Sequence, residues 1–599
     1  MSFPDLRGFL AELQRDGAIV TVDAPVDPHL EVAEIHRRVI AAGGPALLFT
    51  NVKGADHRLV TNLFGTARRA EMAFGTRPLR LIKRLVDLVE TIVPPTPAKL
   101  WGARDVALEL VKVGSRQVSA GPVSEHVTRD VRLDRLPAIT SWPEDGGPFL
   151  TLPLVYTTHP TKHGHNLGMY RMQIHDHRST GMHWQIGKGG GYHYAVAEAL
   201  KQPLPATVML GGPPALILSA IAPLPENVPE MMLASLIAGE RLRQVKGIGP
   251  HPIVADAEFA LIGQVQPGVR KPEGPFGDHY GYYSLTHDYP VFTVQQIARR
   301  NDAIFPATVV GKPRQEDFFI GDLLQDLLSP LFPVVMPAVD TLWSYGETGY
   351  HSLAAAVVKQ RYAREAMASA FRILGEGQLS LTKFLLVTDR GVDVRNFPAT
   401  LEHILARTRP ETDLYVFSNL SMDTLDYTGP AVNAGSKGVW MGLGDPIREL
   451  PRQFSGAAVP AGVRDVRVFC GGCLVVEVPG YRDEPGVAAR LAGDPAFTDW
   501  PLLVLTDDAT RATRSAINFL WTTFTRFEPA ADISAASQRI VRNHVSYQGP
   551  IVIDARMKPW YPAELFCAEE TASVVSSRWS EYFPQGRVEM GDSARGHLD

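Results

Sequence analysis

Short strand-like runs separated by glycine and proline fill residues 118–310, and they constrain the fold of this chain more than any other feature. The runs are rich in β-branched and aromatic residues, and the only helical spacing among them is an insertion at about 230–240. Many short strands in succession predict a barrel or a sandwich. The runs are LPLVYTTH, LGMYRMQIHD, ATVMLGG, ALILSAI, AEFALIGQV, VFTVQQIA and ATVVG.

Helical and strand-like patterns alternate on both sides of this region. On the N-terminal side, a first helix is followed by the strand AIVTV, and a second helix at about 30–42 is followed by the strand ALLF. This alternation predicts a small α/β domain. On the C-terminal side, helices at about 323–328 and 352–374 and the strand KFLLVTD predict a second one. We therefore expect a multidomain fold of the α+β and α/β classes. The expected domains are 1–117, 118–320, 321–455 and 456–599.

An internal echo appears in the last part of the chain. FLLVTD at 384–389 recurs as LLVLTD at 502–507, and TRPETDL from Thr408 recurs roughly as TRFEPAADI from Thr525. The two intervals agree within a residue. This predicts an extra C-terminal α/β unit related to the one before it. The alternative is that common strand and turn chemistry produced the same pattern twice.

The composition favours neither nucleic acid nor an anionic membrane as a partner. The chain has 59 basic and 64 acidic residues, a net charge of −5 and a pI near 6.4. Its sequence shows no secretory leader pattern and no apolar run that we expect to span a bilayer, which predicts a cytoplasmic protein. Cys470 and Cys473 have CxxC spacing, but VRVFCGGCLVVEV predicts a hairpin around Gly-Gly rather than a redox or metal motif.

The stretch 271–283, KPEGPFGDHYGYY, holds the first candidate site residues. Glu273 and Asp278 bracket a Gly-Pro-Phe-Gly segment, in which proline fixes its own φ and the glycines permit turns that other residues resist. Two carboxylates on one shaped loop can differ in pKa, so that one donates a proton while the other stays charged. The alternative is an ordinary acidic surface turn.

A second stretch about a hundred residues upstream, HNLGMYRMQIHD at 165–176, favours the chemical interpretation. It reads as one strand in which Leu167, Met169, Arg171 and Gln173 share a face, so Arg171 is expected among apolar side chains. A guanidinium placed there needs an anion, which is either a loop carboxylate or a substrate carboxylate. A purely structural ion pair is the competing explanation.

NLGMYR followed by EGPFGDHYGYY closely resembles the UbiD family of decarboxylases, and the resemblance runs with gaps from the N-terminus to the 440s. It implies a split β-barrel that holds prenylated FMN at 118–320 and an oligomerising α/β domain at 321–455. The implied activity is reversible, non-oxidative decarboxylation of an aromatic or conjugated acid, with a hydroxybenzoate type favoured. The implied partners are a flavin prenyltransferase and further copies of the chain, as a homodimer or higher homo-oligomer.

The resemblance also implies catalytic roles. Arg171 would orient the substrate carboxylate, Glu273 would keep the arginine in place, and Asp278 would return a proton to carbon. Two other classes stay open, a UbiD-like protein that binds flavin without catalysis and an ordinary FMN-dependent oxidoreductase.

In this family a divalent metal, Mn²⁺ or Mg²⁺, binds the flavin phosphate with K⁺ nearby, and hard oxygen ligands suit such ions. Asn166 and Glu230 match two of the family's ligands. The third, a histidine, would fall at Gly187 or Lys188, so His193 or His183 would have to substitute, and we assign His193. Lys188 would otherwise meet the phosphate directly. The cofactor-binding residues implied are Asn166, Met169, Arg171, Lys188, Ser219, Ala220 and Lys437.

Overall fold

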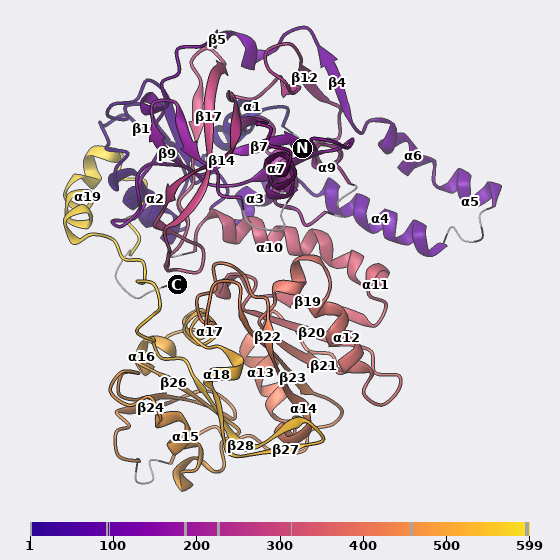
Figure 1. The fold of residues 1–599 in the computed structure, drawn as a ribbon, viewed down its shortest axis with the longest axis vertical. Helices are drawn as coiled ribbons and strands as arrows, with labels where there is room; N and C mark the ends of the chain where they lie inside the picture. Colours follow the sequence, from indigo (N-terminus) through magenta and orange to yellow (C-terminus); the bar gives the residue numbers. More distant parts are fainter. Residues whose placement is uncertain are drawn as a thin grey trace. The chain divides into compact units, whose positions relative to one another are not determined.

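The computed structural model describes residues 3–91, 94, 96–184, 189–224, 228–312, 314–455, 459–592 and 598. The chain forms two compact units, Met1–Leu327 with Glu564–Arg595, and Leu328–Ala563 with Gly596–Asp599 (Figure 1). Both units combine helices with sheets, so the expected multidomain α+β and α/β class is confirmed.

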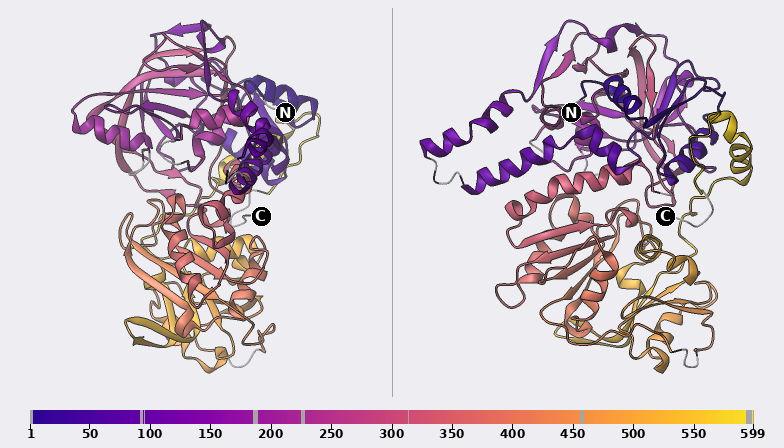
Figure 2. Two further views of the ribbon diagram at one scale, coloured as in Figure 1. Left: turned by 90° about the vertical axis from the view of Figure 1, so that its right-hand side faces the viewer. Right: turned by 180° about the vertical axis from the view of Figure 1, so that it is seen from behind.

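The first unit begins with a small α/β part. Its four-stranded sheet has the order β1-β2-β3-β18, so a strand from the far end of the barrel region completes it. Three helices, α4 to α6, extend away from that sheet (Figure 2), and α19 packs on α2. The elements are α1 (Leu6–Arg15), β1 (Ile19–Val22), α2 (Glu31–Ala41), β2 (Ala46–Phe49), β3 (Arg58–Thr61), α3 (Ala67–Phe74), α4 (Arg77–Thr91), α5 (Pro97–Gly102), α6 (Arg104–Val111), β18 (Ile304–Pro306) and α19 (Glu569–Tyr582).

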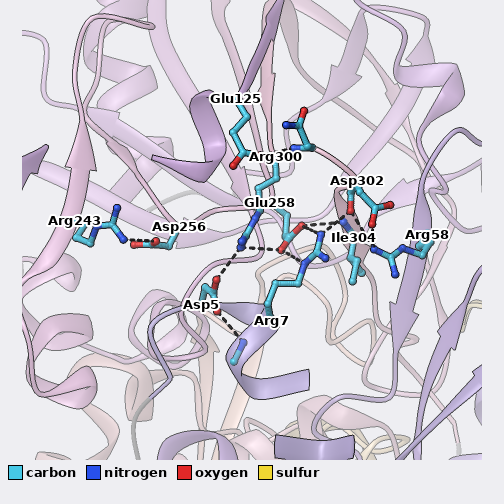
Figure 3. Close-up of polar contacts among 12 residues, drawn as sticks. Asp5, Arg7, Arg58, Glu125, Arg243, Asp256, Glu258, Arg300, Asp302 and Ile304 are labelled. Carbon is cyan, nitrogen blue, oxygen red and sulfur yellow. Dashed lines mark hydrogen bonds and ion pairs between the residues drawn. The ribbon is translucent and has the colours of Figure 1, made fainter. Parts of the chain in front are cut away.

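A buried carboxylate joins the N-terminal helix to the strands of the barrel region (Figure 3). Glu258 is fully buried and accepts two hydrogen bonds from Arg7, at 2.8 and 2.9 Å. The backbone N–H of Ile304 donates to the same carboxylate at 2.9 Å, and Arg300 links it to Asp5 at the start of α1. A buried charge is tolerated when it is paired and hydrogen-bonded in this way.

The barrel region is one curled nine-stranded sheet in the order β6-β9-β10-β17-β14-β11-β7-β8, with β5 also paired to β17. Its longest pair, β14 and β17, is antiparallel and carries the site loop at one end. The sheet strands are β5 (His126–Thr128), β6 (Phe149–Leu150), β7 (Leu154–Thr158), β8 (His165–Met169), β9 (Met172–Asp176), β10 (Ser179–Gly181), β11 (Leu204–Leu210), β14 (Phe259–Glu273) and β17 (His287–Arg299). Around it lie β4 (Ser115–Val118), η1 (Pro122–Ser124), η2 (Leu133–Arg135), α7 (Gly189–Ala199), α8 (Ala215–Ile221), α9 (Glu230–Ala238), β12 (Leu242–Val245), β13 (Ile253–Val254), β15 (Phe276–Gly277) and β16 (Tyr283–Ser284).

Three strand predictions in this region were wrong. HNLGMYRMQIHD is two strands, because β8 pairs with β7 whereas β9 pairs with β6 and β10, and the strand is interrupted at Tyr170-Arg171. ALILSAI forms α8, since Pro213-Pro214 favours a helix start and an all-apolar run has no period that distinguishes strand from helix. ATVVG at 307–311 is not a strand.

The second unit contains two five-stranded sheets with the same topology. Their orders are β19-β20-β21-β23-β22 and β24-β25-β26-β28-β27. In each sheet the two outer pairs are antiparallel and the two inner pairs are parallel. FLLVTD contains β21 and LLVLTD contains β26, so the related extra unit expected from the echo is confirmed.

We call Val339–Gly442 the first repeat and Asp465–Asp554 the second repeat. The elements of the first are β19 (Val339–Ser344), η4 (Gly346–Thr348), β20 (Leu353–Val358), α12 (Glu365–Leu374), η5 (Gly377–Leu381), β21 (Phe384–Thr388), α13 (Phe397–Leu405), α14 (Pro410–Asp413), β22 (Leu414–Leu420) and β23 (Gly435–Gly442). Those of the second are β24 (Asp465–Cys470), β25 (Cys473–Glu477), α15 (Val487–Ala492), η6 (Pro495–Phe497), β26 (Leu502–Thr506), α16 (Ala509–Ala512), α17 (Ala516–Phe524), α18 (Pro529–Asp532), β27 (Ile533–Val541) and β28 (His544–Asp554).

The helix expected at 352–374 is in fact β20 followed by α12. All six residues of β20, LAAAVV, are buried, as an inner strand covered on both faces requires, and this burial overrides the helix preference of alanine. The CGGC segment is the expected hairpin, with Cys470 paired to Cys473 across it.

The stretch Glu316–Val335 comprises α10 (Glu316–Leu328), η3 (Ser329–Leu331) and α11 (Phe332–Val335). With a mean hydropathy of 1.4 it is long and apolar enough to cross a membrane, so the expectation of no such run was wrong. Length and composition alone do not make it a membrane helix, because core helices of soluble proteins pass the same test.

Candidate functional site

Arg171 lies in the two-residue break between β8 and β9, with its side chain only 10% exposed. Its guanidinium donates to three side chains: Nε to Glu273 at 3.3 Å, Nη1 to Asp278, and Nη2 to the Ser284 hydroxyl at 2.8 Å. The ring of Phe276 lies 4.5 Å from the guanidinium carbon. The structure therefore brings together the arginine and both acids that the sequence singled out.

Glu273 is the last residue of β14 and is 1% exposed. Its Oε1 accepts hydrogen bonds from Arg171 and from Nδ1 of His183, the latter at 2.7 Å. Its Oε2 is buried and has no hydrogen-bond partner in the described part of the chain. A Cβ at Gly181 would lie 2.6 Å from this oxygen, so glycine leaves the space beside it open.

Asp278 lies on the loop between β15 and β16 and is 6% exposed. It accepts hydrogen bonds from Arg171 and from both the backbone N–H and the ring of His279. Burial by itself raises the pKa of Asp278, but the His279 hydrogen bond and the Arg171 charge outweigh burial and hold the pKa well below its usual range. The carboxyl is therefore ionised in this arrangement.

The loop that carries these acids is held by Asp145. Its carboxylate accepts the backbone N–H groups of Gly277, Ser141 and Trp142 at 2.8 to 2.9 Å. Burial raises the pKa of Asp145 to about 6, although the three backbone donors oppose the shift. A Cβ at Gly277 would lie 2.0 Å from the Trp142 ring, so only glycine fits this close approach.

His183 belongs to the acid and arginine network. Its ring pairs with Glu273 and lies 4.3 Å, centroid to centroid, from Tyr289. Burial, followed by the charge of Arg171, lowers the pKa of His183, so its neutral form donates one hydrogen bond to the carboxylate. Nδ1 of His183 is thus occupied by Glu273 in this arrangement.

The residues assigned to a metal lie on neighbouring elements. Glu230 begins α9, and its Oε2 accepts the backbone N–H of Leu167 at 3.1 Å, next to Asn166 on β8. Burial raises the pKa of Glu230. His193 on α7 pairs through Nδ1 with Thr157, which faces Asn166 across β7 and β8.

Within the described ranges, no group of three or more His, Cys, Asp or Glu side chains is arranged to hold a metal ion. Burial, and then the neighbouring His159 and His165, lower the pKa of His193 to about 4. Asn166 and Glu230 offer hard oxygen atoms, but these residues do not complete a site for Mn²⁺. Gly187 and Lys188 lie outside the described residues.

Comparison with known families decides the identity of the chain. Three family profiles match it in sequence: the N-terminal, Rift-related and C-terminal domains of 3-octaprenyl-4-hydroxybenzoate carboxy-lyase, at residues 10–89, 116–313 and 318–442. The chain belongs to the UbiD family of carboxy-lyases.

UbiD-family relatives extend over nearly the whole chain. An uncharacterized protein of Chlamydia trachomatis is 50% identical over 584 residues, which cover 97% of this chain and 100% of that protein. A Chlamydia pneumoniae protein, named as a subunit of 4-hydroxybenzoate decarboxylase, is 50% identical over 585 residues, or 98% of this chain and 99% of its own length.

Solved structures share the UbiD fold over a smaller part of the chain. The vanillic acid decarboxylase of Sedimentibacter hydroxybenzoicus in its closed form matches with a TM-score of 0.66 at 24% identity, covering 77% of this chain and 97% of its own. The UbiD-class enzyme HmfF of Pelotomaculum thermopropionicum, solved with FMN, matches with a TM-score of 0.61 at 22% identity, covering 76% and 97%. Part of this chain therefore has no counterpart in them.

The remaining cofactor candidates of the UbiD site are spread over several elements. Met169 ends β8, and Ser219 and Ala220 lie in α8, where the Ser219 hydroxyl donates to the Ala215 carbonyl at 2.9 Å. Lys437 belongs to the second unit. Its Nζ donates to the Thr382 carbonyl at 2.9 Å, and burial lowers its pKa to about 8.

Sequence reasoning missed three residues that contact the candidate site: Ser284, His279 and Asp145. Ser284 and His279 follow the quoted motif or lie inside it, so their positions could have been found from the same stretch. The link between Asp145 and the site loop carries no local signal, because Gly277 is more than a hundred residues away, whereas its other two partners, Ser141 and Trp142, are local.

Proposed function

We propose that this chain catalyses the reversible, non-oxidative decarboxylation of an aromatic or conjugated carboxylic acid, with a hydroxybenzoate type favoured, using prenylated FMN. The observation that carries the proposal is the buried arginine shared by two acids, Arg171 with Glu273 and Asp278. The Chlamydia pneumoniae relative, named for 4-hydroxybenzoate decarboxylase, supports the substrate class. HmfF, solved with FMN and in an evolved form with prenylated FMN, supports the cofactor.

A buried polar atom without a partner fits a polar ligand at this network. It is Oε2 of Glu273, and Oγ1 of Thr180 and Nε1 of Trp184, which flank Gly181 and His183 in the sequence, are also buried and unpaired in the described chain. Because an unpaired buried polar atom costs about 1–3 kcal/mol, a ligand that offers donors and acceptors there gains affinity. When bound, prenylated flavin supplies the electron sink for breaking the carbon–carbon bond. The residues that we assign to hold it are Asn166, Met169, Arg171, Lys188, Ser219, Ala220 and Lys437.

The side chains of this site can orient an acid and manage one proton. Arg171 would exchange its bond with Asp278 for a bond with the substrate carboxylate, because both anions suit the same guanidinium edge. Glu273 and Ser284 would meanwhile keep the guanidinium in place. Moving the Arg171 guanidinium away would remove one of the groups that lower the pKa of Asp278, while His279 stays hydrogen-bonded to it. The pKa would rise, and the carboxyl would take a proton from solvent and pass it to carbon after carbon dioxide leaves.

Mn²⁺ or Mg²⁺ and K⁺ are part of the proposal through Asn166, Glu230 and His193, but no step of the reaction is assigned to a metal, because the described side chains do not complete its site. A flavin prenyltransferase would supply the cofactor. A cytoplasmic location and a homodimer or higher homo-oligomer complete the proposal.

The test is reconstitution with a flavin prenyltransferase, followed by intact cofactor mass, metal analysis and assay of carbon dioxide release from hydroxybenzoate-type acids. Prenylated flavin with turnover that needs no reductant would support the proposal. Bound flavin without turnover on any aromatic acid would favour a binding protein. Turnover that changes the flavin redox state and consumes a reductant would favour an FMN oxidoreductase.

A further inference from the structure

The two repeats of the second unit pack against each other reciprocally. Helix α14 of the first repeat contacts β28 of the second, and the matching helix α18 of the second contacts β23 of the first (Figure 1). Likewise α13 contacts β24, while α17 contacts η4, which follows β19. Reciprocal contacts of this kind define the two-fold, isologous interface of a symmetric dimer. Here they occur inside one chain.

The interface is extensive and apolar. One hydrophobic core contains buried residues of both repeats, among them Phe384 and Phe397 of the first and Phe519 and Phe524 of the second. The rings of Phe397 and Phe519 lie 5.9 Å apart, and those of Phe384 and Phe524 lie 6.2 Å apart. An apolar core shared by two like surfaces resembles the obligate interface of a homodimer.

Polar contacts also join the two repeats on both sides of the interface. The backbone N–H of Ala530 in α18 donates to the Ser436 hydroxyl on β23 at 2.8 Å. On the opposite side, the ring of His544 on β28 bonds the Glu411 carbonyl of α14 at 3.2 Å and lies 4.6 Å from the Tyr415 ring.

The first repeat holds a buried charge cluster. Lys383 Nζ pairs with Asp426 at 2.8 Å, and both side chains are at most 3% exposed. Lys437, on β23, is also buried. Asp426 and Asp423, which pairs with His351, lie on the segment that joins β22 to β23.

The second repeat lacks the corresponding residues. Register identifies Pro501, before β26, as the counterpart of Lys383, and Pro550, before Ile551, as the counterpart of Lys437. The acidic segment is also absent, because only Arg542 and Asn543 join β27 to β28. The second repeat therefore lacks the counterparts of Lys383 and Lys437 and of the segment that carries Asp426.

We propose that the second repeat is an internal partner subunit. It covers the face of the first repeat through which a second copy of that repeat would form a two-fold dimer, and it does so within the same chain. Only the first repeat has the lysine and aspartate cluster. The match to the C-terminal domain of 3-octaprenyl-4-hydroxybenzoate carboxy-lyase ends at residue 442, before the second repeat begins, which agrees with a role for that repeat outside the family's shared domains. The proposal does not depend on which acid is decarboxylated.

The test uses the full-length chain with the double substitution Glu411→Cys and His544→Cys, treated with a short bifunctional thiol reagent. Both positions are partly exposed, the native Cys470 and Cys473 are buried, and the third native cysteine, Cys567, is partly exposed and is replaced by serine in every variant. We expect a bridge within one chain, seen as a single-chain band on denaturing electrophoresis and as one linked peptide pair by mass spectrometry. The pair Glu411→Cys with Arg467→Cys is the control, since β24 lies three strands from β28, about 14 Å away, and should not bridge.

Bridges between two chains would overturn the proposal, because they would mean that the second repeat covers another molecule. Two free, alkylated thiols with no bridge of either kind would also overturn it, because α14 would not lie on β28. Hydrogen exchange of the unmodified chain gives a second measurement. An internal partner keeps α14 and α18 equally protected across a dilution series, whereas protection that falls on dilution indicates a separate subunit.

Discussion

Replacing Arg171 by lysine tests the proposed site most directly, because it keeps the positive charge and removes the geometry. The guanidinium donates in three directions at once, to Glu273, Asp278 and Ser284. A lysine ammonium on a flexible stem is a point charge that cannot reproduce this fork. It can retain one of the three partners.

The expected loss follows from these contacts. Each of the three bonds is donated by the charged guanidinium, and a hydrogen bond to a charged group contributes about 1.5–3 kcal/mol. Losing two of them removes about 3–6 kcal/mol. The same count holds during reaction, when a bond to the substrate carboxylate replaces the bond to Asp278. Since each 1.36 kcal/mol is a factor of ten, kcat/KM should fall about 10²- to 10⁴-fold.

The assay is release of carbon dioxide by reconstituted protein, normalised to bound flavin, with Arg178→Lys as the matched control. Arg178 lies on the exposed turn between β9 and β10, and its replacement should leave kcat/KM unchanged. Arg171→Lys with normal flavin content and a kcat/KM within a few-fold of the unmodified chain would refute the assignment of Arg171 to the substrate carboxylate.

Three further perturbations test the groups around Arg171. Asp278→Asn should abolish turnover and leave flavin bound. Because the pKa of Asp278 is held well below its ordinary value, its ion pairs stabilise the fold at neutral pH, and this stabilisation begins to decline only below the unfolded-state pKa of about 4 and is lost as pH falls through the lower folded-state pKa. The difference in unfolding free energy between variant and unmodified chain, measured with urea, should therefore shrink progressively below about pH 4. Glu230→Ala should reduce flavin and metal content together, measured by absorbance and elemental analysis, and full retention of both would contradict its assignment. Asp145→Ala should speed hydrogen exchange of the Gly277 amide by about fivefold to tenfold at pH 7, since one hydrogen bond of about 1 kcal/mol is lost. Below pH 6 the effect should be smaller, because the raised pKa of Asp145 leaves the native carboxyl protonated and a weaker acceptor.

The sequence predicted the fold class well and individual elements less well, for a physical reason. Periodicity identifies an element when one face is buried and the other exposed, as in α1, where Leu6, Phe9, Leu10 and Leu13 are the buried residues. It fails where a run is buried all round. ALILSAI became a helix and LAAAVV a strand, because tertiary burial decides between the two when no polar face is present.

The site was predicted as far as local chemistry reaches. Glu273, Asp278 and Arg171 were found because a buried charge needs a partner of opposite charge. One motif supplies the arginine and the other supplies the two carboxylates. The strand model behind Arg171 was nevertheless wrong, since the strand is interrupted at Tyr170-Arg171 and β8 and β9 pair with different partners. The pairing of His183 with Glu273 was not foreseen, because it depends on how β14 and the segment after β10 come together.

The rule that a buried charge needs a partner also explains how the two repeats diverged. A buried lysine without its carboxylate is strongly unfavourable, so the loss of either member removes the advantage of keeping the other. In the second repeat the acidic segment is reduced to a two-residue turn, and prolines occupy both lysine positions. Pro501 is acceptable because it stands before β26, and Pro550 because it lies where the register of β27 and β28 shifts, so neither missing N–H interrupts a regular ladder. The sheet order and the interface are present in both copies while the Lys383, Lys437 and Asp426 cluster is present in one, as expected if the second copy is retained for the surface that it covers.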